Sequence, residues 1–274
     1  MASERELKKI AEGREAEMFA WDDGTILRLL RNPDAAWLND LQTTALRVAG
    51  SSGVRVPAVL GTTTVNGRPG LIMERIDGVD YLTLIGRRPW QVFGAASVCG
   101  ELHAKLHGVV APSSLEPLKS RLKRQIETQT KLDESLARLA LETLDTLPDG
   151  DRLCHGDFHP GNILRTREVP VLIDWTNATR GDPNADVART DLLVRIGEPP
   201  PGTSIVVRLL SLFGRRILLG RYMSAYRRRR PFDEQAIARW MIPVAAARLA
   251  EGIEEEVPAL IRFLEQSRAA SGQI

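Results

Sequence analysis

The spacing of hydrophobic and polar positions changes at about residue 76. Before that point, short hydrophobic runs alternate with segments that favour turns or end strands, namely Asp22-Asp23-Gly24, Asn66-Gly67 and Asp77-Gly78. Segments of this kind join neighbouring antiparallel strands in hairpins. The pattern therefore predicts a small antiparallel sheet with one helix. The expected strands include residues 17–21, 25–30, 56–60 and 69–74, and the expected helix covers about 35–49.

The later hydrophobic positions follow a helical period. Two sets of residues recur at intervals of three and four, which is typical of a helix face buried against a core. Pro199 to Gly202 and the Arg230-Pro231 step separate the helices. We therefore expect an α+β fold with a sheet-rich N-terminal lobe of residues 1–76 and a mostly helical C-terminal lobe of residues 77–274. The two sets are Val92, Ala96, Cys99, His103, Leu106 and Val110, and Val206, Leu210, Phe213 and Ile217.

Composition and charge exclude several classes of protein. The hydrophobic fraction of 43% and the charged fraction of 26% are ordinary for a soluble globular protein. A net charge of +2 gives no general basic surface for nucleic acid, and the basic run Arg227–Arg230 fits a solvated helix end. No stretch approaches the roughly 18 apolar residues of a membrane span. Met1–Lys9 lacks the apolar core of a signal peptide, and Cys99 and Cys154 form no disulfide framework. We expect a cytoplasmic protein that binds neither nucleic acid nor membrane.

One segment between the helical regions carries the candidate chemistry. It reads His-Gly-Asp-Phe-His-Pro-Gly-Asn-Ile-Leu over residues 155–164, and a hydrophobic run then ends at Asp174-Trp175. Phosphoryl transfer needs a carboxylate beside the acceptor hydroxyl and further ligands for metal ions on the phosphates. Protein kinases supply these groups as an Asp, an Asn five positions later and a second Asp after the next strand. Asp157, Asn162 and Asp174 have this arrangement.

The joint pattern resembles the catalytic segment of the aminoglycoside phosphotransferase and choline kinase-like superfamily. The resemblance implies a bilobal, protein-kinase-like fold with ATP or GTP in the cleft and a small hydroxyl compound as acceptor. It also implies that Asp157 is the catalytic carboxylate and that Asn162 and Asp174 hold Mg²⁺. Weaker similarity extends along the chain. Met73-Glu74 resembles the hinge where backbone groups meet the nucleotide base, the helix around His103 and His107 resembles the one before the catalytic loop, and Gly181-Asp182-Pro183 with Asp186 resembles the stretch after the metal-binding Asp.

The first lobe departs from the protein-kinase pattern at the phosphate site. It contains no Gly-x-Gly-x-x-Gly sequence, and Arg28 stands where a phosphate-binding Lys is expected. Arg keeps the positive charge but differs from Lys in geometry. The helix residue that would pair with this cation is Gln42 rather than Glu, and Glu15 or Glu17 could serve instead. A pseudokinase that binds nucleotide without transferring phosphate therefore stays open.

The histidines leave a second alternative open. His155, Asp157 and His159 alternate along the chain, as in the metal cluster of a metallohydrolase. We expect His103 to be a hydrogen-bonded core residue and His155 to orient the catalytic loop. Asp182 precedes a proline and would cap a helix, while Asp186 would brace the catalytic loop.

The acceptor is not identified by the sequence. Glu251, Glu254, Glu255 and Glu256 form an acidic cluster that could bind a polycationic drug, but a solvated helix face is the commoner origin of such a cluster. An aminoglycoside, another antibiotic, an amino alcohol, a sugar or another metabolite would fit the reaction equally well. The oligomeric state is also open.

Overall fold

The structure, a computed structural model, describes residues 7–196 and 205–271. Pro199 to Gly202, and the side chains of Val206 and Leu210, lie outside the described residues. The strands are β1 (Lys9–Glu12), β2 (Ala16–Ala20), β3 (Thr25–Leu30), β4 (Val59–Val65), β5 (Arg68–Glu74), β6 (Val79–Asp80), β7 (Arg152–Cys154), β8 (Ile163–Arg165), β9 (Val171–Leu172) and β10 (Thr179–Gly181). The α-helices are α1 (Trp37–Ser51), α2 (Tyr81–Arg87), α3 (Val92–Leu106), α4 (Leu118–Thr128), α5 (Glu134–Asp145), α6 (Pro183–Ile196), α7 (Ile205–Arg229), α8 (Glu234–Arg248) and α9 (Val257–Ser271).

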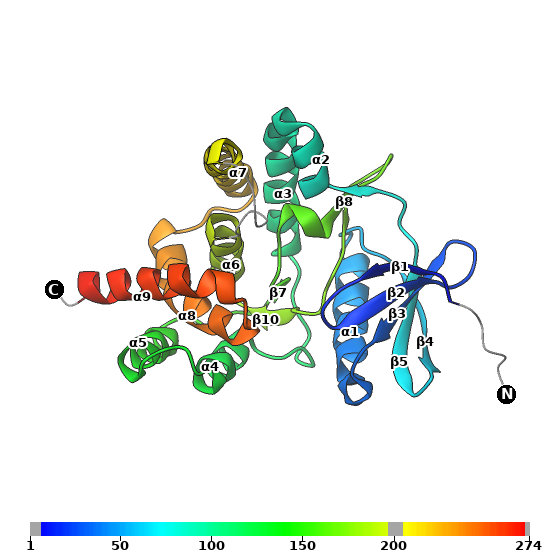
Figure 1. Cartoon of the computed structure of the whole chain (residues 1–274), viewed down its shortest axis with the longest axis horizontal. Coiled ribbons are helices and arrows are strands. Elements are labelled where there is room, and N and C mark those ends of the chain that lie inside the picture. The colour runs from blue at the N-terminus through cyan, green and yellow to red at the C-terminus, as the bar shows by residue number, and fades with distance from the viewer. Residues whose placement is uncertain (1–6, 197–204, 272–274) are drawn as a thin grey trace.

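The first strands form a five-stranded antiparallel sheet in the order β1-β2-β3-β5-β4, with α1 beside it (Figure 1). The expected hairpin turn at Asn66-Gly67 is present, since both residues have positive φ, 50° and 76°, and Asn and Gly tolerate this conformation best. The sequence did not predict β1. All four of its residues are exposed at the sheet edge, so they carry no alternating hydrophobic signal.

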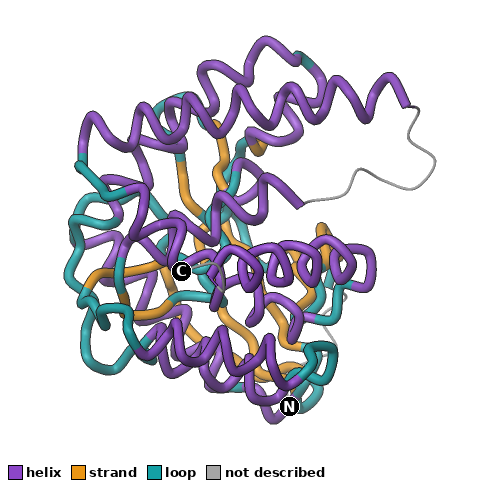
Figure 2. Tube along the Cα trace, turned by 90° about the vertical axis from the view of Figure 1, so that its left-hand side faces the viewer, coloured by secondary structure: helices purple, strands orange, loops and turns teal. Residues whose placement is uncertain are grey.

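Helices make up most of the rest of the described chain, and they predominate on the side of the molecule that Figure 2 shows. Two small antiparallel ladders, β7 with β10 and β6-β8-β9, lie among them. They hold the 155–176 segment between the sheet and the helices. The predicted α+β fold, with an N-terminal antiparallel sheet and a helical C-terminal part, is confirmed. No described helix is long and apolar enough to cross a membrane.

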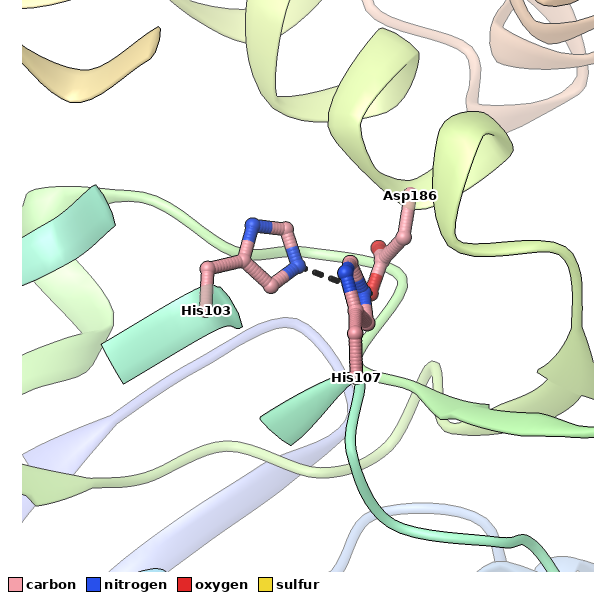
Figure 3. Close-up of side chains that lie close together, drawn as sticks. All are labelled: His103, His107 and Asp186. Atoms are coloured by element: carbon pink, nitrogen blue, oxygen red, sulfur yellow. Dashed lines mark hydrogen bonds and ion pairs between the residues drawn. The ribbon is translucent and has the colours of Figure 1, made fainter. Parts of the chain in front are cut away.

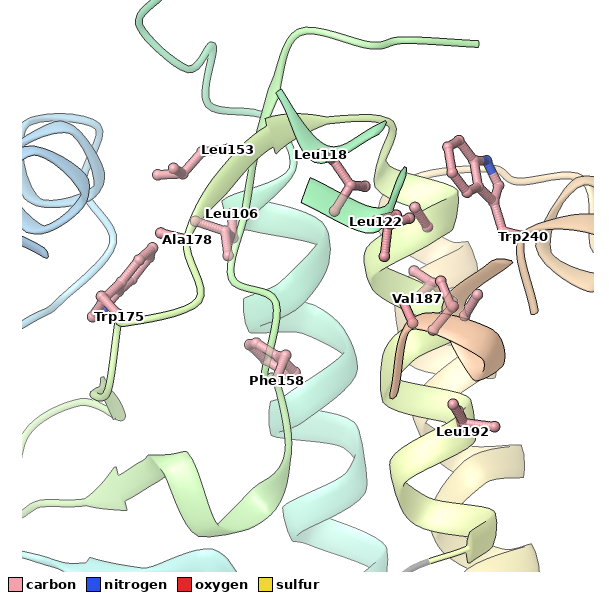
Figure 4. Packing of buried hydrophobic residues seen from close by; sticks show 14 of the residues in the cluster. Leu106, Leu118, Leu122, Leu153, Phe158, Trp175, Ala178, Val187, Leu192 and Trp240 are labelled. Atoms are coloured by element: carbon pink, nitrogen blue, oxygen red, sulfur yellow. The ribbon is translucent and has the colours of Figure 1, made fainter. Parts of the chain in front are cut away.

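One hydrophobic core joins both parts of the chain. Leu71 and Met73 of the sheet belong to the same buried cluster as Phe158, Trp175 and Trp240 of the helical part. Figure 4 shows Phe158 next to a helix and Trp175 on the neighbouring loop, both on the segment that carries the candidate chemistry. Both side chains are fully buried. The catalytic segment is therefore anchored by its own apolar side chains.

The two predicted helix faces are partly wrong. Val110 is 58% exposed, because α3 ends at Leu106 and Val110 pairs through its backbone with Arg152. Phe213 is 65% exposed. Within the described part of α7, the buried residues lie further along the helix and include Leu218, Tyr222, Ala225 and Tyr226.

Candidate active site

The catalytic loop begins with a backbone conformation that only glycine accepts easily. Gly156 has a φ of +78°, and a Cβ atom built there would lie 2.2 Å from the carbonyl oxygen of Asn177. Any side chain would therefore force the two loops apart. This close contact fixes the direction in which the next residue, Asp157, leaves the loop.

Asp186 of α6 braces the loop, as the sequence predicted. Its Oδ2 accepts a hydrogen bond from the backbone N–H of His155 at 2.6 Å, and its Oδ1 accepts one from Gly156 at 2.9 Å. The Nε2 atoms of His103 and His107 also lie 3.1 and 3.2 Å from Oδ2. Figure 3 shows both imidazoles beside this carboxylate. The loop is thus hydrogen-bonded to a fully buried polar centre.

Two tyrosines of α7 complete this centre. The hydroxyl groups of Tyr222 and Tyr226 lie 2.7 Å from the Nδ1 atoms of His103 and His107 respectively. Each histidine can therefore remain neutral, with Nε2–H donating to Asp186 and Nδ1 accepting from a tyrosine. Burial, together with the neighbouring His107, lowers the pKa of His103 to about 3 despite the charge of Asp186. His103 is a hydrogen-bonded core residue, as expected.

His155 orients the loop rather than pointing into solution. Its Nε2 donates to the carbonyl of Ile173 at 3.0 Å, and its Nδ1 accepts from the backbone N–H of Asp157 at 3.3 Å. Both ring nitrogens are therefore occupied by backbone groups. This leaves His155 unable to act as the ligand that the metallohydrolase alternative requires.

Another set of residues meets the spacing of a metal centre in the described part of the chain. His103, His107 and Asp186 place their ligand atoms within 4.8 Å of one another. Their hydrogen bonds to tyrosines and to the loop backbone already account for this buried cluster. It is thus the brace of the loop rather than an open hydrolytic site.

Asp157 lies beside two groups that stabilise its negative charge. The Nε2 atom of His159 is 3.6 Å from Asp157 Oδ2, while the Nδ1 of His159 accepts a hydrogen bond from Gly161. Burial acts to raise the pKa of Asp157, but His159 and the nearby Arg189 more than offset it, so the pKa lies well below its ordinary value. The carboxylate is ionised at neutral pH and can accept a hydrogen bond.

Asn162 and Asp174 lie next to this carboxylate. The Nδ2 of Asn162 donates to Asp157 Oδ2 at 3.1 Å and to the Asp157 carbonyl at 2.9 Å, which leaves its Oδ1 turned away from these bonds. The Ile173 N–H donates to the Asn162 carbonyl at 2.9 Å, so the residue before Asp174 is bonded to Asn162. Asp174 has a φ of +61°, a strained conformation for this residue that is typical of functional sites.

These oxygen atoms suit a hard divalent cation. Asp174 is exposed, and its Oδ1 accepts a hydrogen bond from the Thr176 hydroxyl at 3.0 Å. A carboxylate and an amide oxygen are ligand types that suit Mg²⁺, which binds few protein ligands and keeps its remaining positions for phosphates and water. The residues present therefore fit the metal that the sequence motif implies.

Arg28 lies on β3 with its side chain buried, and Glu15 is its carboxylate partner. Their closest atoms, Arg28 Nη2 and Glu15 Oε2, are 3.5 Å apart, and Arg28 Nη1 is 3.4 Å from Asn39 Oδ1 of α1. Burial lowers the pKa of Arg28, and the charges of Asp174 and Glu15 oppose this shift. Gln42 is also buried, but its Oε1 has no hydrogen-bond partner in the described chain. The pairing with Gln42 is therefore wrong, and the Glu15 alternative is the one observed.

Met73 and Glu74 end strand β5. The N–H of Glu74 donates to Ala58, and its carboxylate pairs with Arg55, so neither group is free for a nucleotide base. A base at this segment would have to use the Glu74 carbonyl or the residues that follow. The hinge role of Met73 and Glu74 stays a prediction.

The acidic cluster near the C-terminus is only partly solvated. Arg189 and Arg248 each pair with one carboxylate oxygen of Glu251. Both oxygens of the buried Glu256 accept from Arg248, at 2.7 and 3.0 Å. Glu254 pairs with Lys131. Glu254 and Glu255 are nevertheless exposed, so the prediction of a solvated face was wrong for Glu251 and Glu256, whose carboxylates are neutralised by arginines.

The sequence reasoning missed several residues around the loop. Arg189 of α6 donates from Nε to the carbonyl of Gly156 at 3.3 Å, and Tyr222 and Tyr226 hold the two core histidines. Arg121 of α4 lies near Glu15 and lines a cavity that reaches Gly156. These residues come from ordinary helical stretches with no local motif, so only the folded chain brings them to the site.

Comparison with known proteins shows the family of this chain. Residues 6–232 match the phosphotransferase enzyme family. A stretch of 165 residues, 52% of the chain, is 27% identical to acyl-CoA dehydrogenase family member 10 of Mus musculus. The match spans 15% of the length of that relative.

Solved structures share the fold. The chain is similar to the apo form of a thermostable mutant of aminoglycoside phosphotransferase APH(4)-Ia, with a TM-score of 0.68 and 18% identity over 98% of this chain and 96% of that chain. A ternary complex of such a mutant with ADP and hygromycin B gives a TM-score of 0.65 and 17% identity over 97% and 92% of the chains. Amicoumacin kinase hAmiN in complex with AMP-PNP, Ca²⁺ and Ami gives 0.63 and 13% over 95% and 87%. The expected bilobal, kinase-like fold is thus confirmed.

Proposed function

Because the chain belongs to the phosphotransferase enzyme family, we propose that it transfers the γ-phosphoryl group of ATP or GTP to a hydroxyl group of a small molecule. One observation carries the proposal. Asp157, Asn162 and Asp174 come from three successive pieces of the loop and strand segment, yet hydrogen bonds join Asn162 both to Asp157 and to Ile173, the residue before Asp174. Structural neighbours that bind ADP or AMP-PNP together with an antibiotic support a nucleotide and an acceptor in the same cleft.

The reaction requires little covalent chemistry from the protein. The acceptor oxygen forms a bond to the γ-phosphorus, the bond from that phosphorus to the β–γ bridging oxygen breaks, and the hydroxyl proton passes to Asp157. A carboxylate of low pKa is a weak base. Asp157 therefore orients the hydroxyl by accepting its hydrogen bond, and takes the proton late, as the oxygen–phosphorus bond forms.

Asn162 and Asp174 are proposed to hold Mg²⁺, which when bound neutralises charge on the phosphates. Arg28 would contribute its positive charge from the strand above, and Glu15 would keep the guanidinium in place while the site is empty of phosphate. Replacement of the expected Lys by Arg retains the charge and adds a planar donor set. This favours a working nucleotide site over a pseudokinase.

The two parts of the chain would have different roles in this reaction. Residues 1–76 would bind the nucleotide, with its base near the hinge after Met73 and Glu74. Residues 77–274 would supply the catalytic loop and the acceptor site.

The test is Mg²⁺-dependent release of ADP or GDP across aminoglycosides, other hydroxylated antibiotics, amino alcohols, sugars and hydroxy acids. Wild type is compared with Asp157→Asn, and each reaction is repeated with EDTA. We expect at least one acceptor to stimulate release, and this release to need both the metal and Asp157. Nucleotide binding without transfer to any acceptor would identify a pseudokinase instead. Acceptor-dependent release that survives in Asp157→Asn would contradict the role of this residue.

A further inference from the structure

Two carboxylates near the catalytic loop, those of Glu116 and Glu251, are already neutralised by arginines. Glu116 precedes α4, and its carboxylate binds Arg121 and Arg124. Glu251, as described above, is shared between Arg189 and Arg248. Each of these two carboxylates is thus held by two guanidinium groups. An ammonium group of an acceptor would have to displace an arginine to reach either one.

A small cavity lies between α4, α6 and α8, next to the loop at Gly156. It has a volume of about 40 Å³ and is lined by Arg121, Gln125, Gly156, Asn177, Arg189 and Glu251, together with apolar residues of α4, α6 and α8. Asp186 also lines it, but its carboxylate already accepts hydrogen bonds from the N–H groups of the loop. Gly156 directly precedes the catalytic Asp157. A group bound in this cavity would therefore belong to a molecule whose hydroxyl can lie at the catalytic carboxylate. A few water molecules, or one carboxylate or phosphate group, would fill this volume.

Arg121 lines this cavity and has hydrogen-bond donors without a partner in the described chain. Its side chain is 11% exposed. In the described chain its hydrogen bonding is confined to Nε, which donates to Glu116 at 3.0 Å. The two terminal nitrogens of its guanidinium group have no partner there. Burial lowers the pKa of Arg121, while Glu116 raises it. A partly buried guanidinium with two free donors is a suitable receptor for a carboxylate or phosphate, because it can bind either in a bidentate manner.

The N-terminal lobe contacts one residue that lines this cavity. Arg14, in the turn between β1 and β2, donates to the carbonyl of Glu251 at 3.1 Å. The neighbouring Glu15 is paired with Arg28, so its negative charge is already engaged. The turn therefore joins the N-terminal sheet to Glu251 in the helical part of the chain.

We propose that the acceptor is a hydroxyl compound with an anionic group, and that Arg121 binds this group while the hydroxyl lies at Asp157. The inference rests on the proposed phosphotransferase function and specifies its substrate class. It separates this chain from an enzyme for polycationic aminoglycosides, whose ammonium groups would meet arginine rather than free carboxylate.

The test uses two matched sets of compounds that differ in charge. The first set is glucuronate, glucose and glucosamine, and the second is glycerate, glycerol and 3-amino-1,2-propanediol. Binding to the protein with ADP and Mg²⁺ is measured by calorimetry, and turnover by ADP release. The variants are Arg121→Gln, Arg121→Lys and the control Arg124→Gln, which also removes a partner of Glu116 but lies on the exposed side of α4. Circular dichroism verifies that each variant is folded.

We expect the anionic member of a set to bind and react best. Its kcat/KM should fall about tenfold or more in Arg121→Gln, as expected for the loss of a charged hydrogen bond. Arg121→Lys should restore part of the preference, and Arg124→Gln should retain it in full. A preference for glucosamine or 3-amino-1,2-propanediol would overturn the inference. So would an unchanged preference in Arg121→Gln, or a failure of both anions to bind.

The two proposals fail in different ways. Slow hydrolysis of ATP by water is measured in the same samples and depends on the nucleotide site and Asp157, but not on the acceptor cavity. If this hydrolysis is present in wild type and lost in Asp157→Asn while the charge preference is absent, only the acceptor class is wrong. If wild type neither hydrolyses nor transfers phosphate, the proposed function itself is wrong.

Discussion

Arg28 of β3 has a buried guanidinium group that we propose binds the phosphates of the nucleotide. Its side chain is 7% exposed and is held by Asn39 and Glu15. The nearby Asp174 shows that this charge faces the proposed metal site. A guanidinium fixed in this way would bind phosphate without much loss of side-chain entropy.

Replacement of Arg28 should weaken nucleotide binding. Hydrogen bonds to charged groups contribute about 1.5–3 kcal/mol, so Arg28→Ala should raise the Kd for ATP by about 10- to 100-fold. Arg31→Ala is the control, since Arg31 lies three residues further along the chain and pairs with Glu12 at the surface. Titration of ATP with Mg²⁺ into each folded variant measures the effect. Equal affinities in the Arg28 variant and wild type would exclude the proposed contact.

A local motif let the sequence indicate the proposed catalytic residues, whereas residues that act through distant partners could not be predicted. Asp157 and Asn162 lie within one short segment whose spacing reflects the chemistry. By contrast, the partner that neutralises Glu251, Arg189, lies 62 residues away in the chain. The hydrophobic periodicity of the sequence does not indicate such a pair. A carboxylate cluster read from the sequence alone therefore looks solvated even where the fold neutralises it.

At the scale of elements, α3 and α7 cross at unusually short range. Gly100 of α3 faces the backbone of α7, and a Cβ atom there would lie 2.3 Å from the Tyr222 carbonyl oxygen. The absence of a side chain lets the helices approach closely enough for Tyr222 and Tyr226 to reach the histidines of α3. The sequence predicted that α3 is helical, but its helical period does not indicate which helix packs against Gly100.

Two glycine substitutions in α3 should have opposite effects on stability. Gly100→Ala forces α3 and α7 apart, and overpacking of this kind costs about 1–3 kcal/mol. Gly94→Ala adds a methyl group with nothing within 4 Å, so it should stabilise the helix by about 0.5–1 kcal/mol. Urea unfolding of both variants gives the two free energies. If Gly100→Ala stabilised the protein as much as Gly94→Ala, the close crossing would be wrong.

At the scale of the whole molecule, the buried centre beneath the catalytic loop makes stability depend on pH. His103 takes up a proton at an ordinary pKa of 6.5 when the chain is unfolded, but only at about 3 when it is folded. Between these values the unfolded state binds more protons, so the free energy of unfolding falls as the pH falls. Burial also lowers the pKa of His155, which acts in the same direction.

We therefore expect a loss of about 2 kcal/mol from His103 between about pH 7 and about pH 5. Denaturant unfolding across this range measures it, and His103→Gln should show a shallower dependence. Nuclear magnetic resonance of the histidine side chains provides a check that does not require the variant to be stable. A neutral His103 ring with its proton on Nε2 at about pH 5.5 is expected. A protonated ring at this pH would contradict the network.

The fold as a whole brings together the N-terminal sheet, the loop that Asp186 braces and the small cavity beside Gly156. The sequence predicted the two-part α+β architecture because hairpin turns and helical periods differ so clearly along the chain. It could not predict the edge strand β1, whose residues are all exposed. Nor could it predict the hydrogen bond from Arg14, in the turn after β1, to the carbonyl of Glu251. These depend on contacts between segments far apart in the chain.

We propose that Asp157 orients and deprotonates the acceptor hydroxyl and does not bind the nucleotide. The most direct measurement is the rate of transfer of a labelled γ-phosphoryl group to an acceptor in wild type and Asp157→Asn, together with the Kd for ATP of both proteins. We predict that transfer slows by about 10²- to 10⁴-fold, while the Kd changes by less than about threefold. Undiminished transfer in the variant, or a loss of ATP binding that accounts for the slower rate, would contradict the account.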